Sequence, residues 1–269
     1  MKPHLQVLVL GIATMSCVFG WRGEADLVGD HDLQGVATVR IDLPSTPLVV
    51  DTCEPLAPGT CPERLRYAGR ILATGGSASD ARAHAEKPAL VFERDGALAR
   101  LRADVPLAVR GLIEFEIGAV ELPADRNFEF HTDLGDVDVH GVRGAVTIEV
   151  GRGDVAVDGG DAGVAVAVDV GEIDVASGGD VDLSTGAGHV TLVQDGAPRR
   201  VFIDARGDVE LELAASSDLD LEIRADGSIS VQTTTVVALA DHRLVRRVGA
   251  GTIRVEIHAG GNVTVTERP

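Results

Sequence analysis

Acidic side chains offer the most chemistry in this sequence. The chain has 42 Asp and Glu against 24 Lys and Arg, a formal net charge of -18. Paired carboxylates can cleave glycans when they converge in a groove, usually beside aromatic rings that stack on sugars. Aromatic residues make up only 3% of the chain, and strand alternation sends most of the acids to solvent. The acids considered are Asp154, Asp158, Asp161, Asp169, Asp174, Asp180 and Asp182. We therefore expect no catalytic residue and no enzyme; a carbohydrate-active enzyme on a β-helix is the alternative.

Metal and cofactor chemistry finds little support in the motifs. The G-G-x-G-x-D nonapeptide that binds Ca²⁺ in other β-helices is present only as fragments, at Gly159-Gly160-Asp161 and Gly178-Gly179-Asp180. The histidines lack the i,i+4 or H-x-H spacing of metal ligands; they are His131, His140, His189, His242 and His258. No nucleophile elbow or phosphate loop occurs. We expect no cofactor and no metal site, with Ca²⁺ as the one alternative.

Three cysteines are present, at Cys17, Cys53 and Cys61, and the last two flank a loop rich in Pro and Gly, DTCEPLAPGTC. In an oxidising compartment, a Cys53–Cys61 disulfide closing this loop is the expected use. The alternative is a metal or redox pair, which usually needs C-x-x-C spacing or a nearby His. The disulfide leaves Cys17 over.

The N-terminus has the form of an export signal. Lys2 supplies a positive charge, Leu5–Ala13 an apolar stretch, and small residues precede Cys17. The segment resembles a bacterial lipoprotein signal, and the resemblance implies that Cys17 receives the lipid and becomes the mature N-terminus. Thr14 stands where that motif has Leu, so that ordinary cleavage at Ser16 or near Ala25 is the alternative.

The resemblance also implies an address. Val18 follows Cys17 where an Asp would imply inner-membrane retention, so we expect an outer-membrane lipoprotein or a periplasmic or cell-surface protein. No later segment approaches about 20 consecutive apolar residues. Membrane contact is therefore expected through the lipid anchor only.

The elements that must position these residues are strands. We expect a signal over residues 1–17, a tether over 18–31, a β-rich region over 32–118 and a repetitive region over 119–269. The β-rich region contains the cysteine loop and a short helix near 79–87, where SASDARAHAEKP has a Ser/Asp start and a terminal Pro. The 32 glycines suggest many tight turns between short elements.

A unit of the form G-x-V-x-V recurs from Gly135 to Gly188, where successive glycines, counted through Gly163, lie eight to ten residues apart, and it returns further on. Its glycines are Gly135, Gly144, Gly153, Gly171, Gly179, Gly188, Gly207, Gly227, Gly251 and Gly261. The two branched residues of a unit, such as Val137 and Val139, lie two apart and must face the same side of a strand. Inward residues at a fixed period predict an all-β solenoid, or β-helix, in which each coil stacks on the next. The alternative is an antiparallel β-sandwich.

The repeats and their lead-in, IEFEIGAVELPADRNFEFHTDLGDVDVHGVRGAVTIEVGRGDV, resemble the bacterial adhesin-like β-strand-repeat family of unknown function, over residues 36–265. This resemblance implies a β-helical fold and a location outside the cytoplasm, and it brings no catalytic residues.

We therefore expect a non-catalytic binding or structural module of the cell envelope, adhesin-like in type. Its exposed rows of Asp, Thr and Glu would contact an unknown protein or glycan, or another copy of the chain by self-association. The acidity argues against a nucleic-acid partner, because phosphate contacts need clustered Lys and Arg. A scaffold or sensor of an envelope-stress system is a further alternative.

Overall fold

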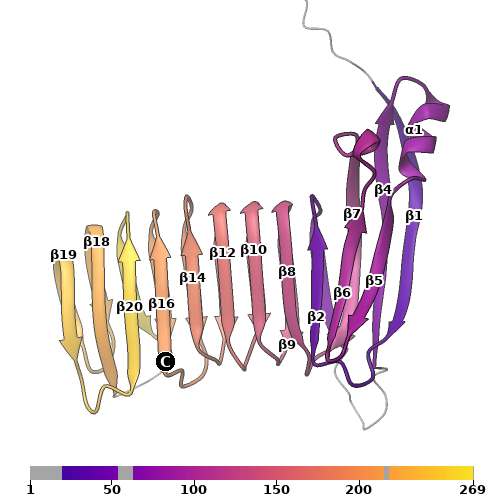
Figure 1. Ribbon diagram of the computed structural model, residues 1–269. Helices are drawn as coiled ribbons and strands as arrows, with labels where there is room; N and C mark the ends of the chain where they lie inside the picture. Colours follow the sequence, from indigo (N-terminus) through magenta and orange to yellow (C-terminus); the bar gives the residue numbers. More distant parts are fainter. Residues whose placement is uncertain (1–19, 54–62, 215–217, 269) are drawn as a thin grey trace, which may run out of the picture.

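The computed structural model describes residues 20–53, 63–214 and 218–268. These residues form 21 strands, joined by hydrogen bonds into one continuous sheet, together with one α-helix and one 3-10 helix. The strands stand side by side along one long axis, and the sheet wraps into an elongated solenoid (Figure 1).

Two rows of parallel strands form the two sides of the solenoid. In spatial order the first row is β6 (Leu98–Asp104), β2 (Thr38–Leu43), β8 (Asn127–Leu134), β10 (Val146–Arg152), β12 (Val164–Val170), β14 (Val181–Thr185), β16 (Arg200–Ala205) and β20 (Ile253–Ala259). The second row is β7 (Ile113–Pro123), β3 (Leu48–Cys53), β9 (Val137–Val142), β11 (Val155–Gly159), β13 (Ile173–Ser177), β15 (Val190–Gln194), β17 (Val209–Leu213) and β21 (Val263–Glu267). One strand from each row makes one coil.

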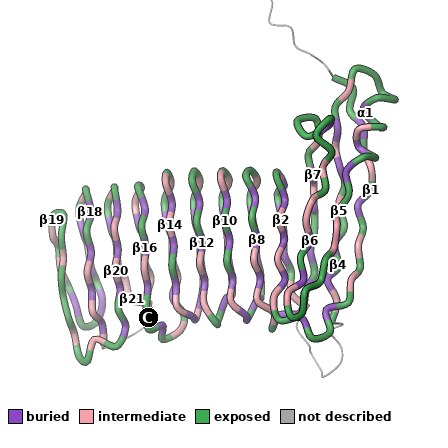
Figure 2. The backbone as a smooth tube through the Cα atoms, viewed as in Figure 1, coloured by how far each residue is buried: buried purple, intermediate pink, exposed green. Residues whose placement is uncertain are grey.

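The predicted inward pairs fill the core. Val137 and Val139 are buried, as are the branched pairs of the following units, and each stacks on its equivalent in the next coil. Buried and exposed residues alternate along the strands (Figure 2), as strands with one face in the core must do. The all-β solenoid is therefore confirmed. Parallel pairing between successive coils rules out the antiparallel sandwich.

The coils do not follow one another in sequence order at the ends. After β17 the chain passes over one coil position and forms β18 (Leu219–Gln232), which runs through both rows, then turns back antiparallel as β19 (Val237–Arg247). Only then do β20 and β21 fill the space between β18 and the β16/β17 coil (Figure 1). At the other end, β2 and β3 lie likewise between the β6/β7 coil and the β8/β9 coil.

Antiparallel strands and a helix cover the N-terminal end. β4 (Arg64–Gly75) pairs with β7, and β5 (Ala89–Asp95) pairs with β6. The expected short helix is α1 (Ala78–Ala85), and the Ser77 side chain caps it by accepting from the Asp80 N–H. The 3-10 helix η1 spans Leu107–Val109. Among the described residues, no helix is long and apolar enough to span a membrane.

The tether expected over 18–31 is wrong for most of its length. Strand β1 (Trp21–Asp32) pairs with β4 along all twelve residues. The sequence of β1 shows no alternation of apolar and polar residues, because only Gly23 and Leu27 are buried and charged residues fill most of the exposed positions. A strand at the edge of a sheet needs few apolar residues, and charges there discourage further pairing.

Candidate functional site

The polar residue after the glycine has, in several of the G-x-V-x-V units, a structural role that the repeat pattern alone does not reveal. Asp136 Oδ1 accepts a hydrogen bond from the Asp154 N–H at 3.0 Å, across one coil of 18 residues, and Asp154 Oδ1 accepts from the Glu172 N–H at 2.8 Å. The same corner continues through His189, Asp208, Asn262 and Ser228. These side chains thus satisfy the backbone of the next coil. The consistent polar type after the glycine was the available signal.

The other acids lie where alternation placed them. Asp158, Asp161, Asp169, Asp174 and Asp182 are exposed. Burial opposes ionisation of Asp180, but N–H groups of Arg199 and Arg200 and the Arg199 guanidinium outweigh it and lower the pKa of Asp180. An open groove of about 400 Å³ on the second row collects Asp136, Asp138, Asp154, Glu172 and Asp174. Within the described ranges, no three carboxylate, imidazole or thiol groups are arranged to hold a metal ion.

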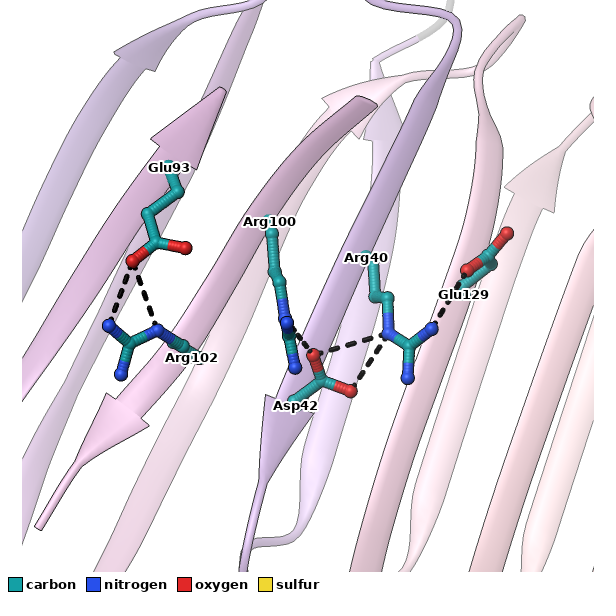
Figure 3. Close-up of polar contacts among 6 residues, drawn as sticks. All are labelled: Arg40, Asp42, Glu93, Arg100, Arg102 and Glu129. Carbon is teal, nitrogen blue, oxygen red and sulfur yellow. Dashed lines mark hydrogen bonds and ion pairs between the residues drawn. The ribbon is translucent and has the colours of Figure 1, made fainter. Parts of the chain in front are cut away.

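An ion-pair cluster crosses the first row near its N-terminal end (Figure 3). Asp42 on β2 accepts from Arg40 Nε at 2.9 Å and from Arg100 Nε on β6 at 2.6 Å. Arg40 also reaches Glu129 on β8 at 3.8 Å. Beside them Arg102 on β6 binds Glu93 on β5 at 2.8 Å, and this hydrogen bond lowers the pKa of Glu93. The cluster joins strands from distant parts of the sequence. Because every arginine in it is paired with a carboxylate, it has no free cation for a ligand.

A second charged region surrounds an open cleft of about 650 Å³ at the C-terminal end, lined by residues of β16, β18, β19 and β20 and the turns that follow β16 and β20. The polar residues of its lining are Asp204, Arg206, Arg224, Asp226, His242, Arg243 and His258. Three arginines and two histidines thus meet two aspartates, in a chain whose net charge is -18. The cleft thus gathers arginines and histidines on an acidic protein, and nearby carboxylates offset part of their charge.

The cations of this cleft differ in how far they are paired. Arg224 and Arg243 share Glu222, at 2.8 and 3.6 Å, and the hydrogen bond from Arg224 lowers the pKa of Glu222. Arg206 is exposed, and no carboxylate lies within 4.0 Å of its guanidinium in the part of the chain that the structure describes. His258 Nε2 is buried with no hydrogen-bond partner among those residues, the nearest carboxylate oxygen being Glu256 Oε1 at 3.7 Å. Arg206 therefore has unused donor capacity at the surface, whereas the His258 Nε2 atom is not accessible to solvent.

An outward aromatic ring stands beside the cleft. Phe202 on β16 lies edge-on to the His258 ring, with 6.0 Å between centroids, and the Arg200 guanidinium lies 5.1 Å from the Phe202 centroid. Most large side chains of this fold point into the core, so an aromatic on the outer face marks this region as different. A ring next to guanidinium groups offers both an apolar face and cationic donors.

The histidines expected at scattered surface positions are only partly scattered. His131 pairs with Glu149 at 3.2 Å and His140 with Asp138 at 2.9 Å. The folding of β18 to β20 brings His242 and His258 to the same cleft. Sequence reasoning missed this cleft, because its arginines and histidines come from four segments with no shared motif.

The predicted cysteine sites are largely outside the described residues. Cys53 is the last residue of β3. Cys17 and Cys61 lie outside the described ranges. Lipidation of Cys17 and the Cys53–Cys61 disulfide therefore stay predictions.

Fold and surface together define an all-β solenoid protein with charged outer rows and a cleft lined by arginines and histidines. The chain is similar to the solved structure of a "putative cell adhesion protein" from Clostridium sporogenes ATCC 15579, with 14% identity, a TM-score of 0.36, and coverage of 91% of this chain and 100% of that one. It is also similar to a "putative adhesin" from Bacteroides fragilis NCTC 9343, with 14% identity, a TM-score of 0.40, and coverage of 91% and 97%. No protein-family model matches the chain, and no curated protein matches it.

The names of both proteins agree with the adhesin-like resemblance expected from the repeats. At this identity and these TM-scores, the likeness carries no information about a partner or an activity.

Proposed function

We propose that this chain is an exported, non-catalytic binding module of adhesin-like type, and that the cleft at its C-terminal end recognises an acidic, carboxylate-bearing glycan. The observation that carries the proposal is the group of Arg206, Arg224 and His258 in the lining of one cleft, with the Phe202 ring in contact with His258. Elsewhere the outer rows carry mostly carboxylates or arginines that already have partners.

The chemistry of these side chains suits such a ligand. A guanidinium donates two parallel hydrogen bonds to a carboxylate, and Arg206 has no competing carboxylate partner among the described residues. The Phe202 ring can pack on the apolar face of a sugar, which favours a glycan over an acidic peptide.

Glycan-array binding of the full-length chain tests this assignment. We expect binding to uronate- or sialate-type sugars and about a tenfold loss of affinity in Arg206→Ala, the usual scale for one charge-assisted hydrogen bond. Arg152→Ala is the matched control, because Arg152 is exposed at the end of β10, away from the cleft. Binding only to acidic peptides, no binding to acidic sugars, or an equal loss in Arg152→Ala would each contradict the proposal.

The location of the module outside the cytoplasm is a second part of the proposal. Cys17 carries the lipid, and Cys53 and Cys61 form a disulfide after export. The position of β1 supports cleavage before Cys17 over cleavage near Ala25. Cleavage near Ala25 would remove the start of β1, from Trp21 onward to the cleavage site, which pairs with β4.

Metabolic labelling with a clickable fatty acid tests the anchor. Label is expected in the wild type and in Cys53→Ala, and it should disappear in Cys17→Ala. If the wild type stays unlabelled, or if Cys17→Ala keeps the label, the anchor is wrong.

A further inference from the structure

The solenoid ends at its C-terminal side in a strand with one free edge. β19 pairs with β18 along one edge, and no strand in the part of the chain described here pairs with the other edge. Three apolar side chains of β19 are exposed: Val237 at 83%, Leu239 at 84% and Val245 at 58%. Unpaired edges with exposed apolar residues are ready to accept another strand.

The shape of β19 restricts what can pair with it. His242, with φ of 65°, is the only described non-glycine residue with a positive φ, and it divides the strand into two arms. The register with β18 is interrupted opposite this residue. Residues 237–241 continue the second row and residues 243–247 continue the first, so β19 bends around the end of the solenoid as one coil does.

We infer that a second copy of this chain docks here, β19 against β19, antiparallel and centred on His242. A twofold axis through His242 exchanges the two arms, so that the first row of one copy continues into the second row of the other. Such a contact is isologous: every residue pair occurs twice, except the His242–His242 pair on the axis. It also closes on itself and leaves no free β19 edge for further copies.

The residues of β19 are complementary to themselves in this register. Asp241 faces the second copy's Arg243, and Leu239 faces the second copy's Val245. Opposite charges and apolar pairs directly across an antiparallel ladder stabilise it, whereas like charges weaken it. The partly buried side chains of Ala238, Ala240 and Leu244, which pack against the end of the core, gain a covering coil.

In the described part of a single chain, Asp241 has no cationic partner and Arg243 has no carboxylate of its own. Arg243 lies directly opposite Arg224 in the β18–β19 register, and the two share Glu222. No Lys, Arg or His nitrogen lies within 4.0 Å of the Asp241 carboxylate among the described residues. The second copy would give Arg243 its own carboxylate and Asp241 its own guanidinium.

The opposite end of the solenoid does not offer an equivalent docking surface. Its free edges belong to two different strands, β1 and β5, and α1 packs against β1. The bent, self-complementary β19 therefore pairs better with β19 of a second copy than with the N-terminal end.

Sedimentation of the full-length chain, with circular dichroism to verify folding, tests the inference by charge exchange. We expect the wild type to sediment at twice the mass of one chain. Asp241→Arg and Arg243→Asp should each sediment at the mass of one chain, since each places like charges opposite one another. The double variant Asp241→Arg/Arg243→Asp should recover the twofold mass.

Asp95→Arg, a reversal on the free edge of β5 at the other end, is the control and should leave the dimer intact. The inference is overturned if the wild type sediments as one chain, if the folded double variant fails to recover, or if Asp95→Arg alone dissociates the dimer. The sedimentation is measured without a glycan, and the glycan site is tested at Arg206, so the two outcomes are distinguishable although Arg243 also lines the cleft.

Discussion

At the scale of single residues, the repeat encodes more than a core. The branched residues of each unit face inward, but the polar residue after the glycine is constrained as well, because Asp136, Asp154 and Glu172 form a chain of side chain to backbone bonds along one corner. A backbone N–H at such a corner has no strand partner, so that the preceding coil must supply an acceptor. Aspartate and asparagine suit this position because their short side chains bond nearby backbone.

Replacing Asp154 with Ala tests this corner. The Glu172 N–H would lose its acceptor, and the free energy of unfolding should fall by about 1 kcal/mol, the net value of one such bond. Asp158→Ala removes an exposed acid from the same coil and should change stability by less than about 0.5 kcal/mol. Urea unfolding of both variants measures the difference. Equal effects would mean that Asp154 acts only through its charge.

At the scale of elements, the sequence predicts the strands of the regular coils and which face of each strand points into the core. Glycine recurs because the corner demands it: Gly171 has φ of 155°, and a Cβ there would overlap the carbonyl oxygen of Gly153 in the preceding coil. Such local rules repeat in every coil and are therefore visible in one sequence. The sequence does not predict β1, because Leu27 is its single buried apolar side chain and the strand therefore shows no apolar and polar alternation.

The candidate site could not be predicted in the same way. Arg206, Arg224 and His258 share no spacing, and they meet only because β20 is inserted between β16 and β18. The pairing of Asp42 with Arg100 depends likewise on β2 lying beside β6. Period and alternation describe a strand and its turn, whereas the order of coils depends on pairings between strands that lie far apart in the sequence.

At the scale of the whole molecule, one coil near each end enters out of sequence order, β2/β3 at the N-terminal end and β20/β21 at the C-terminal end. A regular solenoid is a sum of similar repeats with nearest-neighbour contacts, so loss of one internal coil costs one repeat. The β20/β21 coil is different, because it bridges β16/β17 to β18 and carries Val255, Ile257, Val263 and Val265 into the core. Removing it breaks the ladder rather than shortening it.

Two deletions distinguish these cases. Removal of residues 164–180 joins Gly163 to Val181, which pairs in register with Val164 and can take its place; the shortened chain should unfold cooperatively at a modestly lower temperature. Truncation after residue 248 removes five buried branched side chains, Ile253 among them, worth about 1.5–3 kcal/mol each, a total comparable to the whole stability of a domain. Thermal melts followed by circular dichroism should show the truncated chain largely unfolded. A truncated chain that melts like the internal deletion would mean that the β18–β19 hairpin can dock directly on β16 and β17 without the inserted coil.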